Sequence, residues 1–208
     1  MTDNQSPGVD RRQQLLDVAR KRFVRDGFAK TPVSAIVKAA GVAQGTFYLY
    51  FDNKQALITE LRREVVRDYE RTLRRIASVG APVDETLARI VVAMADAVAR
   101  NLDLERVFRQ AESGEATLKA AREGRRRLAR QAAELLAADH SLEVVDAERT
   151  ASFVVTLFDH ILYEALAYEP DAIDEVVAES LRFTLQGVGV SPTRVAELLA
   201  QRHTFIPA

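Results

Sequence analysis

Hydrophobic residues recur with a helical period along nearly the whole chain. Between residues 10 and 26, four apolar side chains from Leu15 to Phe23 fall on one face of a helix, and Gly27 follows as a stop signal. No run shows the strict alternation of a half-buried strand, and no Asn-Gly or Asp-Gly pair joins two such runs as a hairpin signal would. The pattern therefore predicts an all-α protein.

Glycine, proline and capping residues divide this pattern into ten predicted helices. Their approximate ranges are 10–26, 33–40, 44–50, 54–77, 83–100, 102–110, 115–138, 144–168, 171–186 and 192–202. The clearest boundary is the stretch from Gly80 to Pro82, which cannot continue a regular helix. The chain is thus expected to have a small N-terminal part and a larger C-terminal part.

Residues 33–50 have the layout of a helix-turn-helix, with two short helices joined at Gly41. When Phe47 and Phe51 point inward, the second helix presents hydrogen-bonding and aromatic side chains and no acidic residue. Such a surface suits the major groove of DNA, where base edges offer donors, acceptors and thymine methyl groups. The pattern alone fits equally well a small packed core that has no DNA partner.

The stretch AAGVAQGTFYLYFDNKQALI, residues 39–58, closely resembles the signature of the TetR family of bacterial transcriptional regulators. The preceding stretch, RRQQLLDVARKRFVRDGFAKTPVSAIVK, residues 11–38, resembles the same family. The resemblance implies a three-helix DNA-binding domain in residues 1–53, a connecting helix at about 54–78, and a helical ligand-binding and dimerisation domain in residues 82–208. It also implies a homodimer that represses from a palindromic operator in duplex DNA until a small-molecule inducer releases it.

By this resemblance, seven residues are assigned to DNA contact. They are Gln44, Gly45, Thr46, Tyr48 and Tyr50 at recognition-helix positions, and Thr31 and Lys54 at backbone-contact positions. Lys54 also stands at the start of a predicted helix, where its charge adds to the positive end of the helix dipole. Ala43 departs from the family, which often has Ser or Thr there, so one capping hydroxyl is missing.

Charge is divided unevenly along the chain. Residues 1–80 carry 15 Lys and Arg against 9 Asp and Glu, a net charge of +6, whereas the remainder carries 14 against 21, a net charge of −7. A positive N-terminal part is what contact with a polyanion requires. The charge division agrees with DNA binding by the first part.

Composition and motifs disfavour an enzyme. The chain has no cysteine and three histidines, with no HExxH motif, nucleophile elbow or phosphate-binding glycine loop, so we expect no catalysis, cofactor or metal site. His160 and Glu164 would supply only two metal ligands, and we expect His160 to be buried with a hydrogen-bond partner. The polar N-terminus and the lack of about 20 consecutive uncharged apolar residues predict a cytoplasmic protein without membrane contact. A helical protein-interaction module is the remaining alternative class.

The helices predicted at 144–168 and 171–186 are the most apolar of the C-terminal part. A helix that is apolar on several faces is buried on several sides. We therefore expect these two helices to form a four-helix bundle with a second subunit, through Leu162, Val177 and Leu181. An ordinary core within one chain is the alternative.

Two features suggest where a ligand binds. Phe108, Phe153, Leu157 and Phe158 are candidates for an apolar pocket, although aromatic residues at helical spacing also fit an ordinary core. The basic run KAAREGRRRLAR, residues 119–130, places Arg122, Arg126 and Arg130 on one helix face, which either faces solvent or binds an anionic ligand.

A basic strip beside an apolar pocket would suit an acyl-coenzyme A. The recognition sequence also resembles that of TetR-family repressors of fatty-acid degradation genes, which respond to such ligands. A multidrug- or xenobiotic-sensing regulator of the same family is the alternative.

Overall fold

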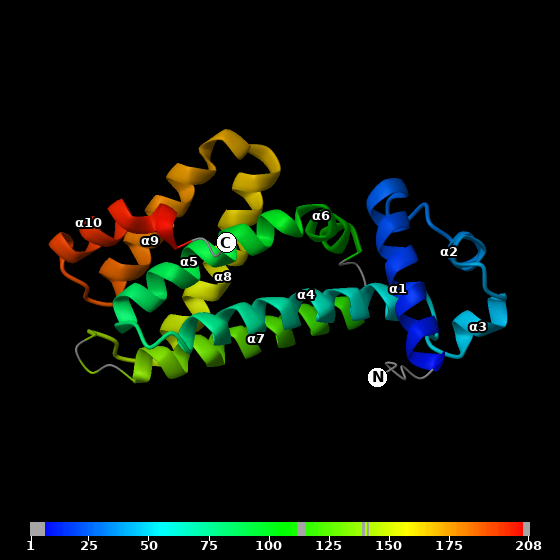
Figure 1. Ribbon diagram of the computed structural model, residues 1–208, viewed down its shortest axis with the longest axis horizontal. Coiled ribbons are helices and arrows are strands. Elements are labelled where there is room, and N and C mark those ends of the chain that lie inside the picture. The colour runs from blue at the N-terminus through cyan, green and yellow to red at the C-terminus, as the bar shows by residue number, and fades with distance from the viewer. Residues whose placement is uncertain (1–6, 112–114, 139, 141, 206–208) are drawn as a thin grey trace, which may run out of the picture. The chain divides into compact units, whose positions relative to one another are not determined.

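The structure, a computed structural model, describes residues 7–111, 115–138, 140 and 142–205 (Figure 1). Its α-helices are α1 Pro7–Asp26, α2 Val33–Ala40, α3 Gln44–Tyr48, α4 Lys54–Ala77, α5 Val83–Arg100, α6 Leu102–Ala111, α7 Glu115–Ala137, α8 Ala147–Tyr168, α9 Ile173–Gly187 and α10 Pro192–Gln201. Two 3-10 helices are η1 Pro170–Ala172 and η2 Arg202–Thr204. The described residues form no strand, and the predicted all-α fold is confirmed.

The helices group into two compact units. The first unit comprises the described residues within 1–64 and 103–121, and the second those within 65–102 and 122–208. Helices α4 and α7 are each divided between the two units. The functional boundaries expected near residues 53 and 82 stay predictions.

In the first unit, α1 packs against α2, and α2 against α3. The apolar face predicted for α1 is buried, with Leu15 and Phe23 fully inaccessible to solvent. Gly41 ends α2 in the left-handed conformation, at φ 64°, which only glycine adopts without cost. The next amide, of Val42, then donates to the carbonyl of Val37 at 3.1 Å, which closes the turn before α3.

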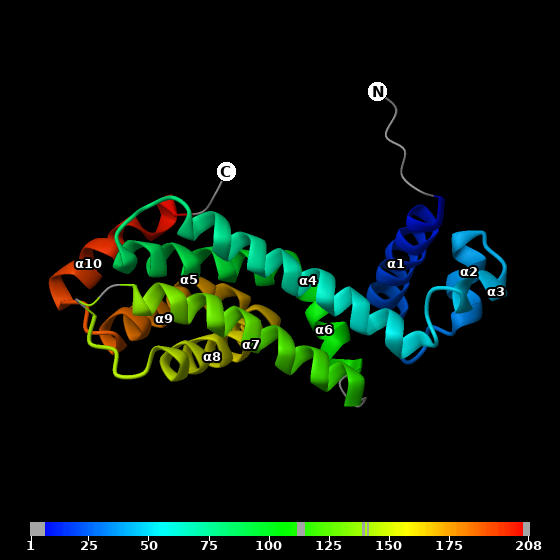
Figure 2. The ribbon, with the colours of Figure 1, turned by 90° about the horizontal axis from the view of Figure 1, so that it is seen from below.

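In the second unit, α9 packs against α5, α8 and α10 (Figure 2). Leu162, Leu181, Leu185 and Leu198 are buried together in this core. Among the described residues, α8 is the one helix whose length and composition would allow it to cross a membrane, which a core helix can also satisfy. It carries Asp159 and Glu164 and contacts α5 and α9, as a core helix does.

Helices α4 and α7 approach closely at Gly124 in the second unit. A Cβ atom at Gly124 would lie 2.9 Å from Cγ2 of Val66. We therefore expect Gly124→Ala to lower the free energy of unfolding by about 1–3 kcal/mol, although alanine favours helix formation. Adding Val66→Ala should recover part of this loss, and urea denaturation followed by circular dichroism measures both variants.

Gly187→Ala is the matched control, because nothing lies within 4 Å of a Cβ atom at Gly187. Its free energy of unfolding should change by less than about 0.5 kcal/mol. Equal losses for Gly124→Ala and Gly187→Ala would show that the approach of α4 to α7 is not tight.

Candidate DNA interface and ligand pocket

Helix α3 presents most of the predicted recognition residues to solvent. Gln44 and Gly45 are exposed, Tyr48 is 52% exposed, and Thr46 and Tyr50 are partly buried. Aromatic packing holds this helix in place: the buried ring of Phe47 lies 5.3 Å from that of Tyr48 and 5.7 Å from that of Phe51. Ala43 precedes α3 without a side-chain cap, as its sequence implied. The structure thus places four of the five recognition positions on α3, and Tyr50 follows two residues after its end.

Leu49 is a surface residue that the sequence analysis missed. It directly follows α3 and is 80% exposed. The spacing could have revealed it, because Leu49 lies 200° around a helix from each of the inward-facing residues Phe47 and Phe51. Exposed Lys30 and Lys38 were also overlooked. All three are candidates for DNA contact.

Thr31 is buried in the first unit, so its side chain is poorly placed to contact a DNA phosphate. The residue is 1% exposed, and its hydroxyl donates to the carbonyl of Gly27 at 2.8 Å. Both its burial and this hydrogen bond give Thr31 a role in fixing the chain between α1 and α2. Its assignment to DNA contact stays a prediction that its burial does not favour.

Lys54 connects the start of α4 to the loop after α1. Its ammonium donates to the carbonyl of Phe28 at 2.6 Å and to that of Ala29 at 3.4 Å, and lies 4.3 Å from the centre of the Phe28 ring. Burial lowers the pKa of Lys54 below its ordinary value. Lys54 therefore stabilises the first unit, in addition to the phosphate contact predicted for it.

Lys54→Met tests this structural role. We expect the free energy of unfolding to fall by about 1–2 kcal/mol, because a charge-assisted hydrogen bond and a cation–π contact are lost. Lys38→Met, an exposed lysine in the last turn of α2, should change it by less than about 0.5 kcal/mol. Equal stabilities of both variants in urea would leave Lys54 with no role in the fold.

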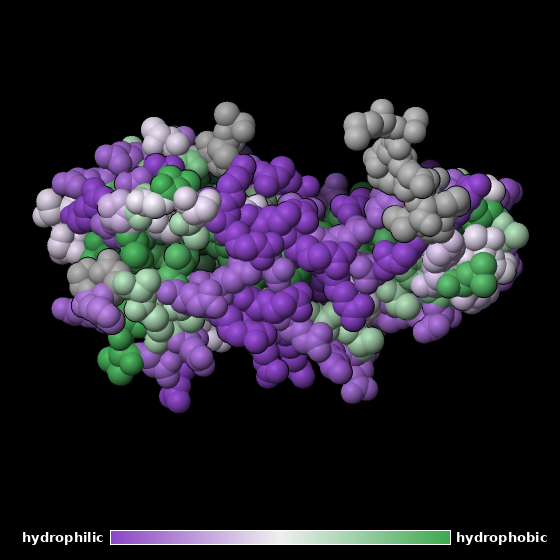
Figure 3. Space-filling view, turned by 60° about the horizontal axis from the view of Figure 1, so that its bottom comes forward, coloured by the Kyte–Doolittle hydropathy of each residue, from purple (hydrophilic) through white to green (hydrophobic). Residues whose placement is uncertain are grey.

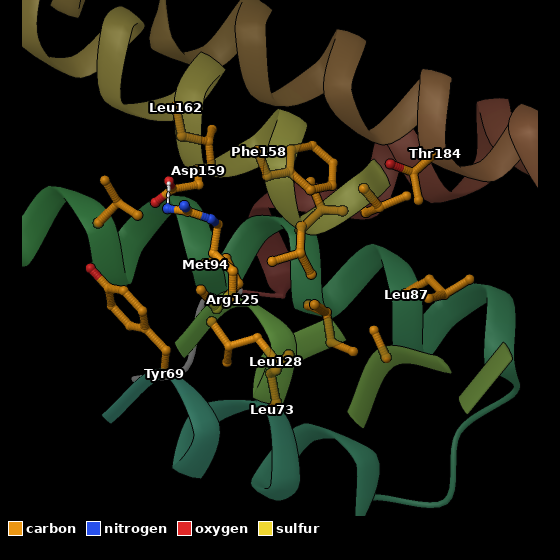
Figure 4. A pocket seen from close by; sticks show the side chains of 16 residues that line it. Tyr69, Leu73, Leu87, Met94, Arg125, Leu128, Phe158, Asp159, Leu162 and Thr184 are labelled. Carbon is orange, nitrogen blue, oxygen red and sulfur yellow. Dashed lines mark hydrogen bonds and ion pairs between the residues drawn. The ribbon is translucent and has the colours of Figure 1, made fainter. Parts of the chain in front are cut away.

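The second unit contains a cavity of about 80 Å³ (Figure 4). Side chains from α4, α5, α7, α8 and α9 line it, and those labelled in the figure are Tyr69, Leu73, Leu87, Met94, Arg125, Leu128, Phe158, Asp159, Leu162 and Thr184. Nearly all of the lining is apolar. Besides the hydroxyl groups of Tyr69 and Thr184, its polar part is an ion pair in which Arg125 Nη1 lies 3.3 Å from Asp159 Oδ2.

The residues predicted to bind a ligand do not come together at this cavity. Of the apolar group, Phe158 lines it, whereas Phe153 and Leu157 face solvent on α8. Phe108 is buried in the first unit, with the Arg62 guanidinium 4.9 Å from its ring centre. The apolar pattern identified α8 correctly but could not distinguish its inner face from its outer one.

The basic strip also lies outside the cavity. Arg122, Arg126 and Arg130 are exposed, and Figure 3 shows hydrophilic side chains gathered over this part of α7. Arg126 and Arg130 line a separate, open groove with Glu148 and Ser152. The arginine that reaches the cavity is Arg125, which the sequence analysis did not select. The sequence did contain a signal for this: Leu128 and Ala132 lie three and seven residues after Arg125, so all three residues share one face of the helix.

The three residues predicted at the dimer interface lie inside the second unit. Leu162 and Leu181 are almost inaccessible, and Val177 is 9% exposed. Within one chain they leave little surface for a partner, so their burial does not favour this assignment. His160 is exposed on α8, and the expectation that it is buried is wrong.

Other apolar side chains of α8 and α9 do face solvent. Phe153 is 75% exposed and Phe183 is 62% exposed. The lining of a shallow groove between these helices includes the acidic Glu169, Glu175 and Glu179 and the apolar Leu157, Ile161, Val176 and Phe183. We call these four apolar residues the α8–α9 groove.

Comparison with known proteins finds a family match within the first unit. The profile of the bacterial regulatory proteins of the tetR family matches residues 15–61, which contain α2 and α3. The chain is 32% identical over 96 residues to the HTH-type transcriptional repressor KstR2 of Rhodococcus jostii, covering 46% of this chain and 47% of that protein. It is 33% identical over 78 residues to the fatty acid metabolism regulator protein of Bacillus subtilis, covering 38% and 40%. The chain thus matches less than half the length of these curated relatives.

The likeness in structure extends further along the chain. The fold superposes on Thermus thermophilus FadR, a TetR-family transcriptional repressor solved in complex with lauroyl-CoA, with a TM-score of 0.68. The two sequences are 26% identical, and the match covers 86% of this chain and 96% of that one. The resemblance to the TetR family predicted from residues 11–58 is confirmed, and the all-helical C-terminal part has the fold expected of it.

Proposed function

We propose that this chain, whose residues 15–61 match the tetR-family profile, is a transcriptional repressor that binds duplex DNA through α2 and α3 and releases it when a small ligand binds. The observation that carries this proposal is the exposed side of α3, where Gln44, Gly45 and Tyr48 lie within the residues matched to the family. These groups can hydrogen-bond and pack against base edges in a major groove. We propose a cytoplasmic regulator with no enzymatic activity.

Selection from random DNA tests this function. The full chain is used to enrich a pool of random duplexes, and we expect an inverted repeat whose half-sites lie about 34 Å apart. Affinity for the enriched duplex should fall steeply between 50 and 200 mM salt, because phosphate contacts release counterions. A scrambled duplex of the same composition is the control. Enrichment of no sequence at all would contradict the proposal.

We place the contact between two subunits on the α8–α9 groove. Its four apolar residues, together with the neighbouring exposed Phe153, leave a hydrophobic surface in water that a second copy of the chain would cover. A twofold dimer uses the same patch on both subunits and matches the symmetry of an inverted DNA repeat. The apolar helices singled out in the sequence thus remain the proposed interface, through their exposed faces.

The cavity of the second unit is the proposed ligand site. The T. thermophilus FadR structure holds lauroyl-CoA, which supports an acyl-CoA or a ligand with a similar apolar chain for this protein. A xenobiotic sensor is the alternative, because a nearly apolar lining accepts many ligands. Its volume of about 80 Å³ is below the roughly 300–1,000 Å³ of ordinary ligand pockets, so a ligand must widen it.

Widening the cavity provides a route for release of DNA. Tyr69 and Leu73 form its α4 wall, and the flexible Met94 can move aside more readily than its branched neighbours. A ligand that displaces Tyr69 and Leu73 moves the second half of α4. Because α4 is one continuous helix from Lys54 to Ala77, its first half, which holds the loop after α1 through Lys54, would respond.

A further inference from the structure

We infer that Arg125 is the residue that reads the polar group of the ligand, and that it binds an anion in place of Asp159. This inference deepens the proposed ligand response and rests on it. Among the described residues, Arg125 and Asp159 are the two charged side chains of the cavity lining. Tyr69 and Thr184 add hydroxyl groups, and the Thr184 hydroxyl already donates to the carbonyl of Ser180 at 2.9 Å. A polar ligand group therefore meets the ion pair.

The ion pair can be exchanged at low cost. The side chains of Arg125 and Asp159 are 34% and 41% exposed, so water reaches both. Partly exposed ion pairs contribute little to stability, because water competes for both charges. A guanidinium also has five N–H donors, of which the contact with Asp159 uses one. A ligand carboxylate or phosphate can therefore bind Arg125 through its remaining donors and displace the single contact with Asp159.

The local charge favours an anion over a cation. Arg122, Arg126 and Arg130 are exposed on the same helix and form no ion pair with a described residue. Arg127, by contrast, is already paired with Glu70 at 2.6 Å. The surplus of positive charge on α7 attracts an anion to Arg125 and repels an ammonium group that would pair with Asp159. The ligand class that fits is an amphipathic anion whose apolar body enters the cavity.

Position on α7 distinguishes Arg125 from its neighbour. Arg125 shares the cavity-facing side of the helix with Leu128 and Ala132. Arg126, the next residue, is exposed and lines the separate open groove. The two arginines thus form a matched pair for mutation, with the same charge on the same helix and different surroundings.

Calorimetric titration of the full chain without DNA tests this inference. The probes are decanoate, 1-decanol and decylammonium, which share one apolar chain and differ in head group. We expect decanoate to bind about tenfold more tightly than 1-decanol, and Arg125→Gln to remove this preference. Asp159→Asn should raise the affinity for decanoate severalfold, since it removes the competing carboxylate. Arg126→Gln should weaken decanoate binding far less than Arg125→Gln does, because it removes only a screened charge at a distance and no direct contact.

Several outcomes would overturn the inference. They are equal affinities of the wild type for decanoate and 1-decanol, a preference for decylammonium, equal losses in Arg125→Gln and Arg126→Gln, and binding of none of the probes. Thermal melting of each variant confirms that it is folded. Because no DNA is present, a chain that binds decanoate through Arg125 but enriches no DNA sequence would contradict the repressor function and leave this inference standing.

Discussion

Leu181→Asp should unfold the second unit, whereas Phe183→Asp should leave it folded and monomeric. Leu181 is fully buried in the core, so an aspartate there would place an unpaired charge among apolar side chains, at a cost of more than about 4 kcal/mol. Phe183 lies two residues further along α9 and is 62% exposed in one chain. A charge there meets water in the monomer and becomes unfavourable only when a second copy covers the α8–α9 groove.

Circular dichroism and sedimentation velocity distinguish these effects. Leu181→Asp should lose most of its helical signal or aggregate, while Phe183→Asp should keep the signal and sediment as a monomer at micromolar concentration. The monomer should also bind the inverted repeat weakly, because a single subunit contacts one half-site. Gln186→Asp, which adds one negative charge at an exposed position of α9 outside the groove lining, is the control for added negative charge. A wild-type chain that is itself monomeric would contradict the proposed interface.

Tyr48→Ala should reduce discrimination between the selected duplex and its scrambled form by about 5- to 150-fold. The estimate corresponds to the roughly 1–3 kcal/mol that a good contact to a base edge contributes. Tyr48 is 52% exposed and its ring packs edge-on against Phe47, so removal of the ring should change the DNA surface more than the core. Fluorescence anisotropy of labelled duplexes at several salt concentrations measures both affinities.

Tyr168→Ala is the matched control for this substitution. Tyr168 is an exposed tyrosine at the end of α8, whose ring packs edge-on against Tyr163. It lies in the second unit, and its removal should leave both DNA affinities unchanged. The prediction is wrong if Tyr48→Ala discriminates between the selected and the scrambled duplex as well as the wild type does, or if Tyr168→Ala loses as much discrimination. Either result would show that the exposed side of α3 does not determine sequence preference.

Local signals in the sequence predicted the helices well. Gly41 and Pro82 mark breaks that follow from backbone conformation alone, and the apolar face of α1 from Leu15 to Phe23 is buried as its period required. The ends of the helices differ from the prediction by three residues or fewer. Backbone preferences and the spacing of neighbouring residues determine helix ends and helix faces, so these features can be predicted from a single sequence.

The partners of individual side chains could not be predicted in the same way. Lys54 binds carbonyl groups 25 and 26 residues earlier in the chain, and Arg125 pairs with Asp159, 34 residues later. Helical periodicity gives the spacing of residues around one helix but does not say which neighbour each face meets. For that reason the basic run was recognised on α7, while the arginine that reaches the cavity was not.

The apolar residues of α8 illustrate the same limit. Phe153, Leu157, Phe158 and Leu162 are equally hydrophobic in sequence, yet Phe158 and Leu162 line the cavity and Phe153 faces water. Only the packing of α5 and α9 against α8 separates these faces. Sequence analysis therefore found the helix that carries both the pocket and the proposed interface, and the structure assigned residues to each.

Ligand-dependent release from DNA tests the central claim most directly. A fluorescently labelled duplex obtained by selection is bound to the full chain, and its anisotropy is followed while lauroyl-CoA is added. Coenzyme A without an acyl chain is the control. The account predicts high anisotropy for the selected duplex, low anisotropy for a scrambled one, and a fall to the free value as lauroyl-CoA saturates the protein. Equal binding of the selected and scrambled duplexes, or binding that neither lauroyl-CoA nor decanoate reverses, would contradict it.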